Sequence, residues 1–220
     1  LVDQGGLLHC WEQATGRLLW TTALDGNPSG PPTIANRKVY VGSSEGSLAV
    51  FDLTDGHSHG VLRSPVGLTT AIKVIGKSLF FGCSDGAVRA VDFDAGKVLW
   101  CEDIGRVPFS LGMAISQESL MVAAKEGVLA LDLVSGKRRG EMLTGDVIQG
   151  VTCQRGRTFV RLRRSGSQEI SAHDVLVACS SDSASVLWQY VLPSTGSGSI
   201  GVDSSTIALP AASGQVVLFR

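Results

Sequence analysis

The chain has 220 residues, of which 44% are hydrophobic and 18% charged. This size and composition predict one compact domain with a substantial core, which excludes a disordered protein. No apolar run is long enough to cross a bilayer, and the formal charge of -1 predicts no bulk attraction to nucleic acid or anionic lipid.

A repeat runs along the whole chain. Short apolar runs begin at glycines spaced by about 40 residues, and a fixed period of this length is the signature of stacked supersecondary units. The glycines are Gly6, Gly46, Gly86, Gly127, Gly166 and Gly214.

Each repeat reads as a series of short strands. Apolar segments at 39–41 and 79–81 are predicted second strands, and a fourth strand is predicted over 17–23 in the first copy. The third strands are predicted at 7–11, 47–51 and 87–91. Their two faces are both largely apolar, which is typical of blades packed between neighbouring blades. The sequence therefore predicts an all-β protein, a β-propeller of four-stranded antiparallel blades.

An acidic residue follows the third strand, and a glycine stands four residues later. The carboxylate can accept backbone N–H bonds inside the turn, and glycine supplies the positive φ that closes it. Recurrence at one place in each repeat favours this structural role over acid–base catalysis or calcium binding. The pairs are Glu12 and Gly16, Asp52 and Gly56, Asp92 and Gly96, and Asp132 and Gly136.

Tryptophan recurs in the fourth strand, as Trp20, Trp100 and Trp188, whereas two copies have Gly60 and Gly140 instead. A large aromatic side chain here is predicted to cover the gap between blades while its indole N–H meets a carbonyl.

Residues 85–100, DGAVRAVDFDAGKVLW, resemble the repeat of quinoprotein-like propellers, the family named for pyrroloquinoline quinone (PQQ). This PQQ-like repeat is shared by quinoprotein alcohol dehydrogenases, outer-membrane assembly scaffolds and the propeller of acyl-activating enzymes. The resemblance covers nearly the whole chain and is clearest up to Gly136. The Trp-Asp and Gly-His signatures of WD40 repeats are missing.

The repeat divides a single predicted domain, 1–220, into units at about 1–27, 28–65, 66–105, 106–145, 146–193 and 194–220. The first unit supplies only a third and a fourth strand, and the last stops after its third. This count of about 21 strands favours a fragment of a larger propeller. The alternative is that the strand at 17–23 completes the last blade.

The resemblance to quinoproteins implies adjacent cysteines beside the cofactor and a calcium site built from Glu, Asn and Asp. None of the five cysteines is adjacent to another, and Asn27 and Asn36 are the only asparagines. The sequence therefore predicts no cofactor and disfavours PQQ. The odd number of separated cysteines favours buried thiols in a reducing compartment, which leans toward the cytoplasm.

An arginine-rich segment is the most unusual local feature. In a second strand, Arg157, Phe159, Arg161 and Arg163 share one face, and Arg164 follows them. Such a fork can hold a phosphate, a carboxylate or an acidic peptide, and a small anion or sugar at Arg163 is a further hypothesis. The alternative is a solvated edge. Nucleic acid is disfavoured, because aromatic stacking partners are sparse.

His57 and His59 share one strand face, but no third metal ligand is indicated by spacing. Segments 28–32 and 194–199 are predicted connections between blades, and no phosphate-binding loop motif is present.

The sequence therefore predicts a non-catalytic scaffold or binding domain with no catalytic or metal residues. Its partner is another protein or another domain of its own polypeptide, within a larger protein such as an acyl-activating enzyme. The alternative is a fragment of a PQQ-dependent oxidoreductase.

Overall fold

The computed structural model describes residues 1–3, 5–105, 112–124, 127–164, 173–181, 185–192, 200–203, 205–210 and 216–219. All the regular structure in these ranges is β-strand. A search of the same residues finds no helix of the length and hydropathy needed to span a membrane. The repeat glycines Gly166 and Gly214 and the predicted connection at 194–199 lie outside the described residues.

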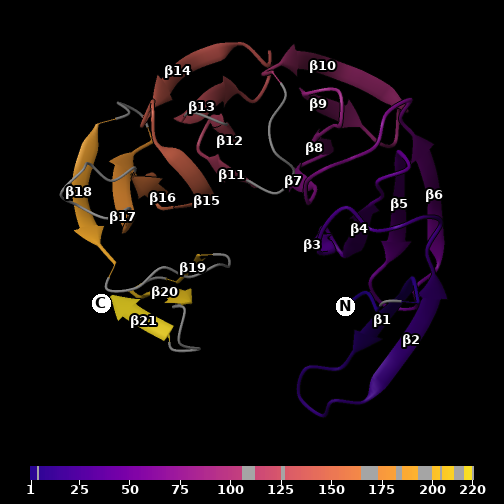
Figure 1. The fold of residues 1–220 in the computed structure, drawn as a ribbon. Coiled ribbons are helices and arrows are strands. Elements are labelled where there is room, and N and C mark those ends of the chain that lie inside the picture. Colours follow the sequence, from indigo (N-terminus) through magenta and orange to yellow (C-terminus); the bar gives the residue numbers. More distant parts are fainter. Residues whose placement is uncertain are drawn as a thin grey trace. The chain divides into compact units, whose positions relative to one another are not determined.

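The chain forms two compact units, Leu1–Ser110 and Leu111–Arg220. The first unit holds three antiparallel sheets, of two, four and four strands, each built from consecutive strands (Figure 1). Their strands are β1 (Leu7–Trp11) and β2 (Leu18–Ala23); β3 (Thr33–Ala35), β4 (Lys38–Gly42), β5 (Ser47–Asp52) and β6 (Ser58–Arg63); and β7 (Lys73–Ile75), β8 (Ser78–Gly82), β9 (Ala87–Asp92) and β10 (Lys97–Asp103).

The second unit also holds three antiparallel sheets of consecutive strands, with four, four and three strands in the described ranges. Their strands are β11 (Met113–Ser116), β12 (Ser119–Ala124), β13 (Gly127–Asp132) and β14 (Arg138–Met142); β15 (Val147–Gln154), β16 (Arg157–Arg164), β17 (His173–Ser180) and β18 (Val186–Val191); and β19 (Gly201–Val202), β20 (Ile207–Pro210) and β21 (Val216–Phe219).

The core lies between sheets, because the middle strands of each sheet carry apolar side chains on both faces. In the first unit, Leu48 and Val50 of β5 pack against Leu79 and Phe81 of β8. In the second unit, Val160 of β16 packs toward the β11–β14 sheet, and its neighbour Phe159 packs toward the β19–β21 sheet. Outer strands are far more exposed, and every described residue of β18 is exposed.

The predicted strands are confirmed. The third strands β1, β5 and β9 coincide with the predicted segments or extend them by one residue. The described ranges contain 21 strands, with two in the first sheet and three in the last. Within the first unit β2 pairs with β1. The alternative in which the strand at 17–23 completes the last blade stays a prediction. The single domain over 1–220 stays a prediction.

Candidate functional site

The acidic turns hold their carboxylates in local hydrogen bonds. Asp52 Oδ1 accepts the backbone N–H of Thr54 at 2.7 Å, and Asp92 Oδ1 accepts that of Ala95 at 3.0 Å. Glu12 instead accepts the hydroxyl of Thr15. The glycines that follow all have positive φ, with values of 71° at Gly16, 73° at Gly56, 61° at Gly96 and 72° at Gly136.

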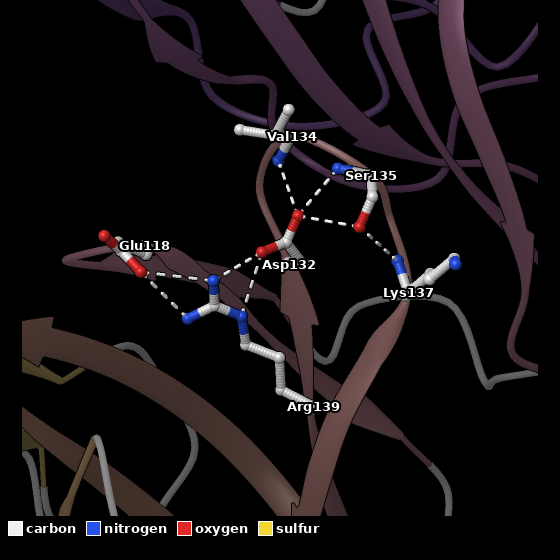
Figure 2. A network of polar contacts seen from close by, with 6 residues as sticks. All are labelled: Glu118, Asp132, Val134, Ser135, Lys137 and Arg139. Atoms are coloured by element: carbon white, nitrogen blue, oxygen red, sulfur yellow. Dashed lines mark hydrogen bonds and ion pairs between the residues drawn. The ribbon is translucent and has the colours of Figure 1, made fainter.

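Asp132 has the most extensive set of such contacts (Figure 2). Its Oδ1 accepts the hydroxyl and the backbone N–H of Ser135, both at 2.7 Å, and the backbone N–H of Val134 at 3.1 Å. Its Oδ2 accepts a hydrogen bond from Nε of Arg139 at 3.0 Å, and the same guanidinium donates a hydrogen bond to Glu118 at 3.2 Å. The hydrogen bonds from Ser135 and Arg139 hold the pKa of Asp132 well below its usual range. A carboxylate bound in this way stabilises a turn and is a poor proton carrier.

The fourth-strand tryptophans lie in different surroundings. The indole N–H of Trp20 donates to the carbonyl of Leu53, in the turn after β5, at 3.0 Å. Trp100 is 8% exposed and its ring centroid lies 5.8 Å from that of Phe80. Trp188 is 38% exposed, and its ring centroid lies 6.2 Å from that of Phe159.

The arginine-rich segment forms β16, the second strand of its sheet, as its sequence predicted. Arg161 is 1% exposed, and its Nη2 lies 2.9 Å from Oδ2 of Asp174, which is fully buried. Arg163 Nε lies 2.9 Å from Oδ1 of the same carboxylate. Arg161 Nη1 also donates to the carbonyl of Pro210 at 3.2 Å, which ties β16 to the β19–β21 sheet. The carboxylate bound by this arginine pair is therefore an internal one.

The solvated-edge interpretation of this segment is wrong for Arg161, because its guanidinium is buried between two sheets. Arg164 is paired with Asp146, with Nη2 3.2 Å from Oδ2. The side chain of Arg163 is 42% exposed, and an anion or sugar there stays a prediction.

The remaining two predicted residues, Arg157 and Phe159, line a cleft of about 540 Å³ in the second unit. It lies between the β15–β18 sheet and the turn joining β19 to β20. Its lining residues are Gln154, Arg155, Arg157, Phe159, Trp188, Gln189, Tyr190, Val202, Asp203, Ser205, Thr206 and Ile207. The structure thus brings Arg157 and Phe159 together with Trp188 and separates them from the pairs formed by Arg161, Arg163 and Arg164.

The cleft combines aromatic side chains with a basic side chain, Arg157, and an acidic one, Asp203, that are open to a ligand. Among the described residues, the side chain of Arg157 makes no ion pair or hydrogen bond. Asp203 Oδ1 accepts the backbone N–H groups of Ser205 at 2.8 Å and Thr206 at 2.7 Å, which hold the pKa of this carboxyl below its usual value. Tyr190 and Trp188 project their rings from an exposed strand. Tryptophan, tyrosine and arginine are the residues that dominate protein–protein binding sites.

Sequence reasoning missed three residues that matter here. Asp174 stands directly before the apolar run of β17. A carboxylate at such a buried position could have indicated that it pairs with an arginine of β16. Tyr190 stands two residues after Trp188, so the period of a strand places both rings on one face. Asp203 carried no recognisable signal.

The two histidines of 57–59 have few potential partners. Their ring centroids lie 6.5 Å apart, and His59 Nε2 lies 3.8 Å from Oδ2 of Asp52. A search of the described residues finds no group of three His, Cys, Asp or Glu side chains that could hold a metal ion.

The successive antiparallel sheets, with acidic turns after third strands and tryptophan in β2, β10 and β18, define a β-propeller of PQQ-like repeats. A family model described as outer membrane protein assembly factor BamB matches residues 1–108 and 84–220, and the chain belongs to this family.

The crystal structure of BamB from Moraxella catarrhalis is similar to this chain, with a TM-score of 0.73 and 14% sequence identity. The match covers 99% of this chain and 65% of that one, and it shows a shared fold. No curated protein matches the sequence.

Proposed function

We propose that this chain is a non-catalytic propeller that binds a partner protein or another domain of its own polypeptide. The observation that carries the proposal is the cleft in which Trp188, Tyr190 and Arg157 are presented together beside exposed strand β18. The description of the matching family as an assembly factor supports a binding role. The local hydrogen bonds accepted by the carboxylates of the acidic turns support a structural role for these residues.

The test is to isolate the partner from native material, purify it and measure its affinity for the chain. Replacing both Trp188 and Tyr190 with alanine should weaken binding about tenfold or more, because aromatic anchors carry most of the energy of such interfaces. Trp11→Ala is the matched control, since Trp11 is 42% exposed and lies outside the cleft. Equal affinity of the double variant and the control would contradict the proposal.

We also propose that the chain belongs to a larger polypeptide such as an acyl-activating enzyme. The five cysteines are all free, which suits a reducing compartment. Intact mass spectrometry and peptide mapping of the native polypeptide test this directly. A native mass well above 23.0 kDa, with an adenylate-forming domain in the peptide map, is expected, and a native chain of that mass alone would contradict it.

The chain is further proposed to bind no PQQ. Its cysteines are not adjacent in sequence, and the described residues gather no set of three potential calcium or metal ligands. Adding PQQ and Ca²⁺ should change neither the absorption spectrum of the quinone nor the melting temperature. A saturable change in both would favour the oxidoreductase alternative.

A further inference from the structure

A small cavity lies between two four-stranded sheets of the first unit, β3–β6 and β7–β10. Its volume is about 200 Å³, which is below the roughly 300–1,000 Å³ of pockets that hold drug-sized ligands. Tyr40, Leu79 and Phe93 line it with aromatic and aliphatic surface, and the first two are buried. The cavity therefore suits the ring or short hydrocarbon chain of a small molecule.

Charged side chains also line this cavity. Lys38 comes from the start of β4, Lys77 from the turn before β8, and Asp94 from the turn after β9. Asp94 Oδ1 lies 3.7 Å from Nζ of Lys38, so these two charges offset each other. Among the described residues, the side chain of Lys77 makes no ion pair or hydrogen bond. One positive charge is thus left unmatched at the cavity, which favours an anionic ligand.

The hydroxyl of Tyr40 adds a neutral hydrogen-bond donor. Burial and the nearby carboxylate of Asp94 raise the pKa of Tyr40, so its hydroxyl keeps its proton at neutral pH. Within the described ranges, this hydroxyl donates no hydrogen bond to another residue. A buried donor of this kind is available to a ligand oxygen.

The other repeats show that the fold does not need these polar groups. Tyr40 is the third residue of a second strand, where β8, β12 and β16 have Phe80, Met121 and Phe159. Asp94 stands two residues after the acidic residue of its turn, where the turns after β5 and β13 have Thr54 and Val134. The phenol and the carboxylate therefore need an explanation other than strand or turn formation.

We propose that this cavity binds a small organic carboxylate with an apolar body. The body packs against Leu79 and Phe93, and the carboxylate accepts hydrogen bonds from the Tyr40 hydroxyl and the Lys77 ammonium. Both sheets that form the site lie within the first unit, and the inference does not rest on the proposed binding of a partner protein.

Phenylpropionate is the probe, because it combines a ring, a short chain and one carboxylate. It is titrated against the full 220-residue chain while NMR amide chemical shifts are recorded. Saturable shift changes confined to the amides of 36–40, 76–79 and 93–94 are expected at millimolar concentrations, as suits a ligand of this size. Phenylpropionamide has the same shape without the charge and should bind at least about tenfold more weakly.

Two variants test the two donors. Tyr40→Phe should weaken phenylpropionate binding about tenfold, because it removes a buried donor to a charged oxygen and keeps the ring. Phenylalanine stands at the matching position of β8 and β16, so this variant should fold. Lys77→Gln should weaken binding about threefold, the size expected of an exposed ion pair. Arg37→Gln is the matched control, since Arg37 is exposed on the turn before β4 and does not line the cavity.

Asp94→Thr tests the sign of the ligand's charge. It should strengthen phenylpropionate binding about threefold, because it removes a like charge and frees Lys38 to meet the carboxylate. Threonine is the residue at the matching place in the turn after β5, so the turn should be kept.

Several results would overturn the inference. These are shift changes that do not saturate or lie elsewhere, phenylpropionamide binding as tightly as the acid, and weaker binding by Asp94→Thr. Unchanged affinity of Tyr40→Phe at an unchanged melting temperature would also overturn it. The proposed function would stand in each case, because its test depends on Trp188 and Tyr190.

Discussion

Arg161 and Asp174 form an ion pair in the interior of the second unit, with Nη2 2.9 Å from Oδ2 and both side chains at most 1% exposed. Arg163 binds the other oxygen of the same carboxylate. Arg161, Arg163 and Asp174 therefore form a charged network where the β15–β18 sheet contacts β20. Such a network stabilises a fold only while each member keeps its partner.

Asp174→Ala should therefore lower the free energy of unfolding by about 3–5 kcal/mol, because it leaves the buried Arg161 without a counter-charge. The measurement is urea unfolding of the variant beside the parent chain. Asp146→Ala is the control, since its partner Arg164 is 39% exposed, and it should cost less than about 1 kcal/mol. Similar losses in the two variants would contradict the assigned role of Asp174.

The hydrogen bond from Trp20 to Leu53 gives a second expectation. Trp20→Phe should lower the free energy of unfolding by about 1 kcal/mol, because phenylalanine keeps much of the packing and loses the indole N–H. Trp188→Phe should have almost no effect on the isolated chain. Chemical denaturation of both variants compares them, and a loss at Trp188 equal to or larger than the loss at Trp20 would contradict this expectation.

Glycine at the end of the acidic turn is required for two separable reasons. Gly16 and Gly56 have nearly the same positive φ, so alanine at either should cost about 1–2 kcal/mol. At Gly56 a Cβ atom would also lie 2.7 Å from ring carbons of Trp20, whereas at Gly16 it meets nothing within 4 Å. Gly56→Ala should thus have the lower melting temperature, and the reverse order would contradict this packing.

The acidic turns make stability depend on pH in a defined direction. Because hydrogen bonds lower the pKa of Asp132 in the folded chain below its ordinary value of 3.8, the unfolded chain binds more protons between the two values. The stabilisation is present above the unfolded pKa and is lost as pH falls below about 5 through the folded pKa. Asp132→Asn should reduce stability at pH 6 and make the loss at acid pH shallower. An unchanged slope in pH-dependent unfolding would show that Asp132 does not contribute.

The free thiols should differ in reactivity. Cys179 is fully buried, and burial raises its pKa to about 11, so the unreactive thiol form persists at pH 8. Cys101 is exposed on β10. Iodoacetamide labelling followed by mass spectrometry should modify Cys101 first and spare Cys179 until the chain unfolds. Equal labelling rates in the folded chain would contradict the burial of Cys179.

The strands and turns were predictable because their signals are local. The alternation in segments such as 47–51 and the acidic residue four positions before Gly56 each determine the structure of a few neighbouring residues. The position of β16 as a second strand followed from the same repeat. These features recur, so each copy supports the prediction of the others.

The cleft and the buried network were not predictable in the same way, because they depend on contacts between distant segments. From the sequence alone, Arg161 is expected at the surface. In the structure it donates hydrogen bonds to Asp174, 13 positions later, and to Pro210, 49 positions later. Arg157 and Arg163 share one strand face in the sequence pattern. In the structure Arg157 lines the cleft, whereas Arg163 binds the buried carboxylate of Asp174. This difference depends on how the next sheet packs, which the strand pattern does not contain.

In the described part of the chain, every sheet joins strands that follow one another directly, so strand pairing never waits for a distant segment. Hairpins form within about 1–10 μs, far faster than a ribosome adds residues. Each sheet can therefore assemble as soon as its last strand is synthesised. The slow step in folding is then the docking of one finished sheet onto the next. Contacts between sheets, such as the hydrogen bond from Arg161 to Pro210, form in that step.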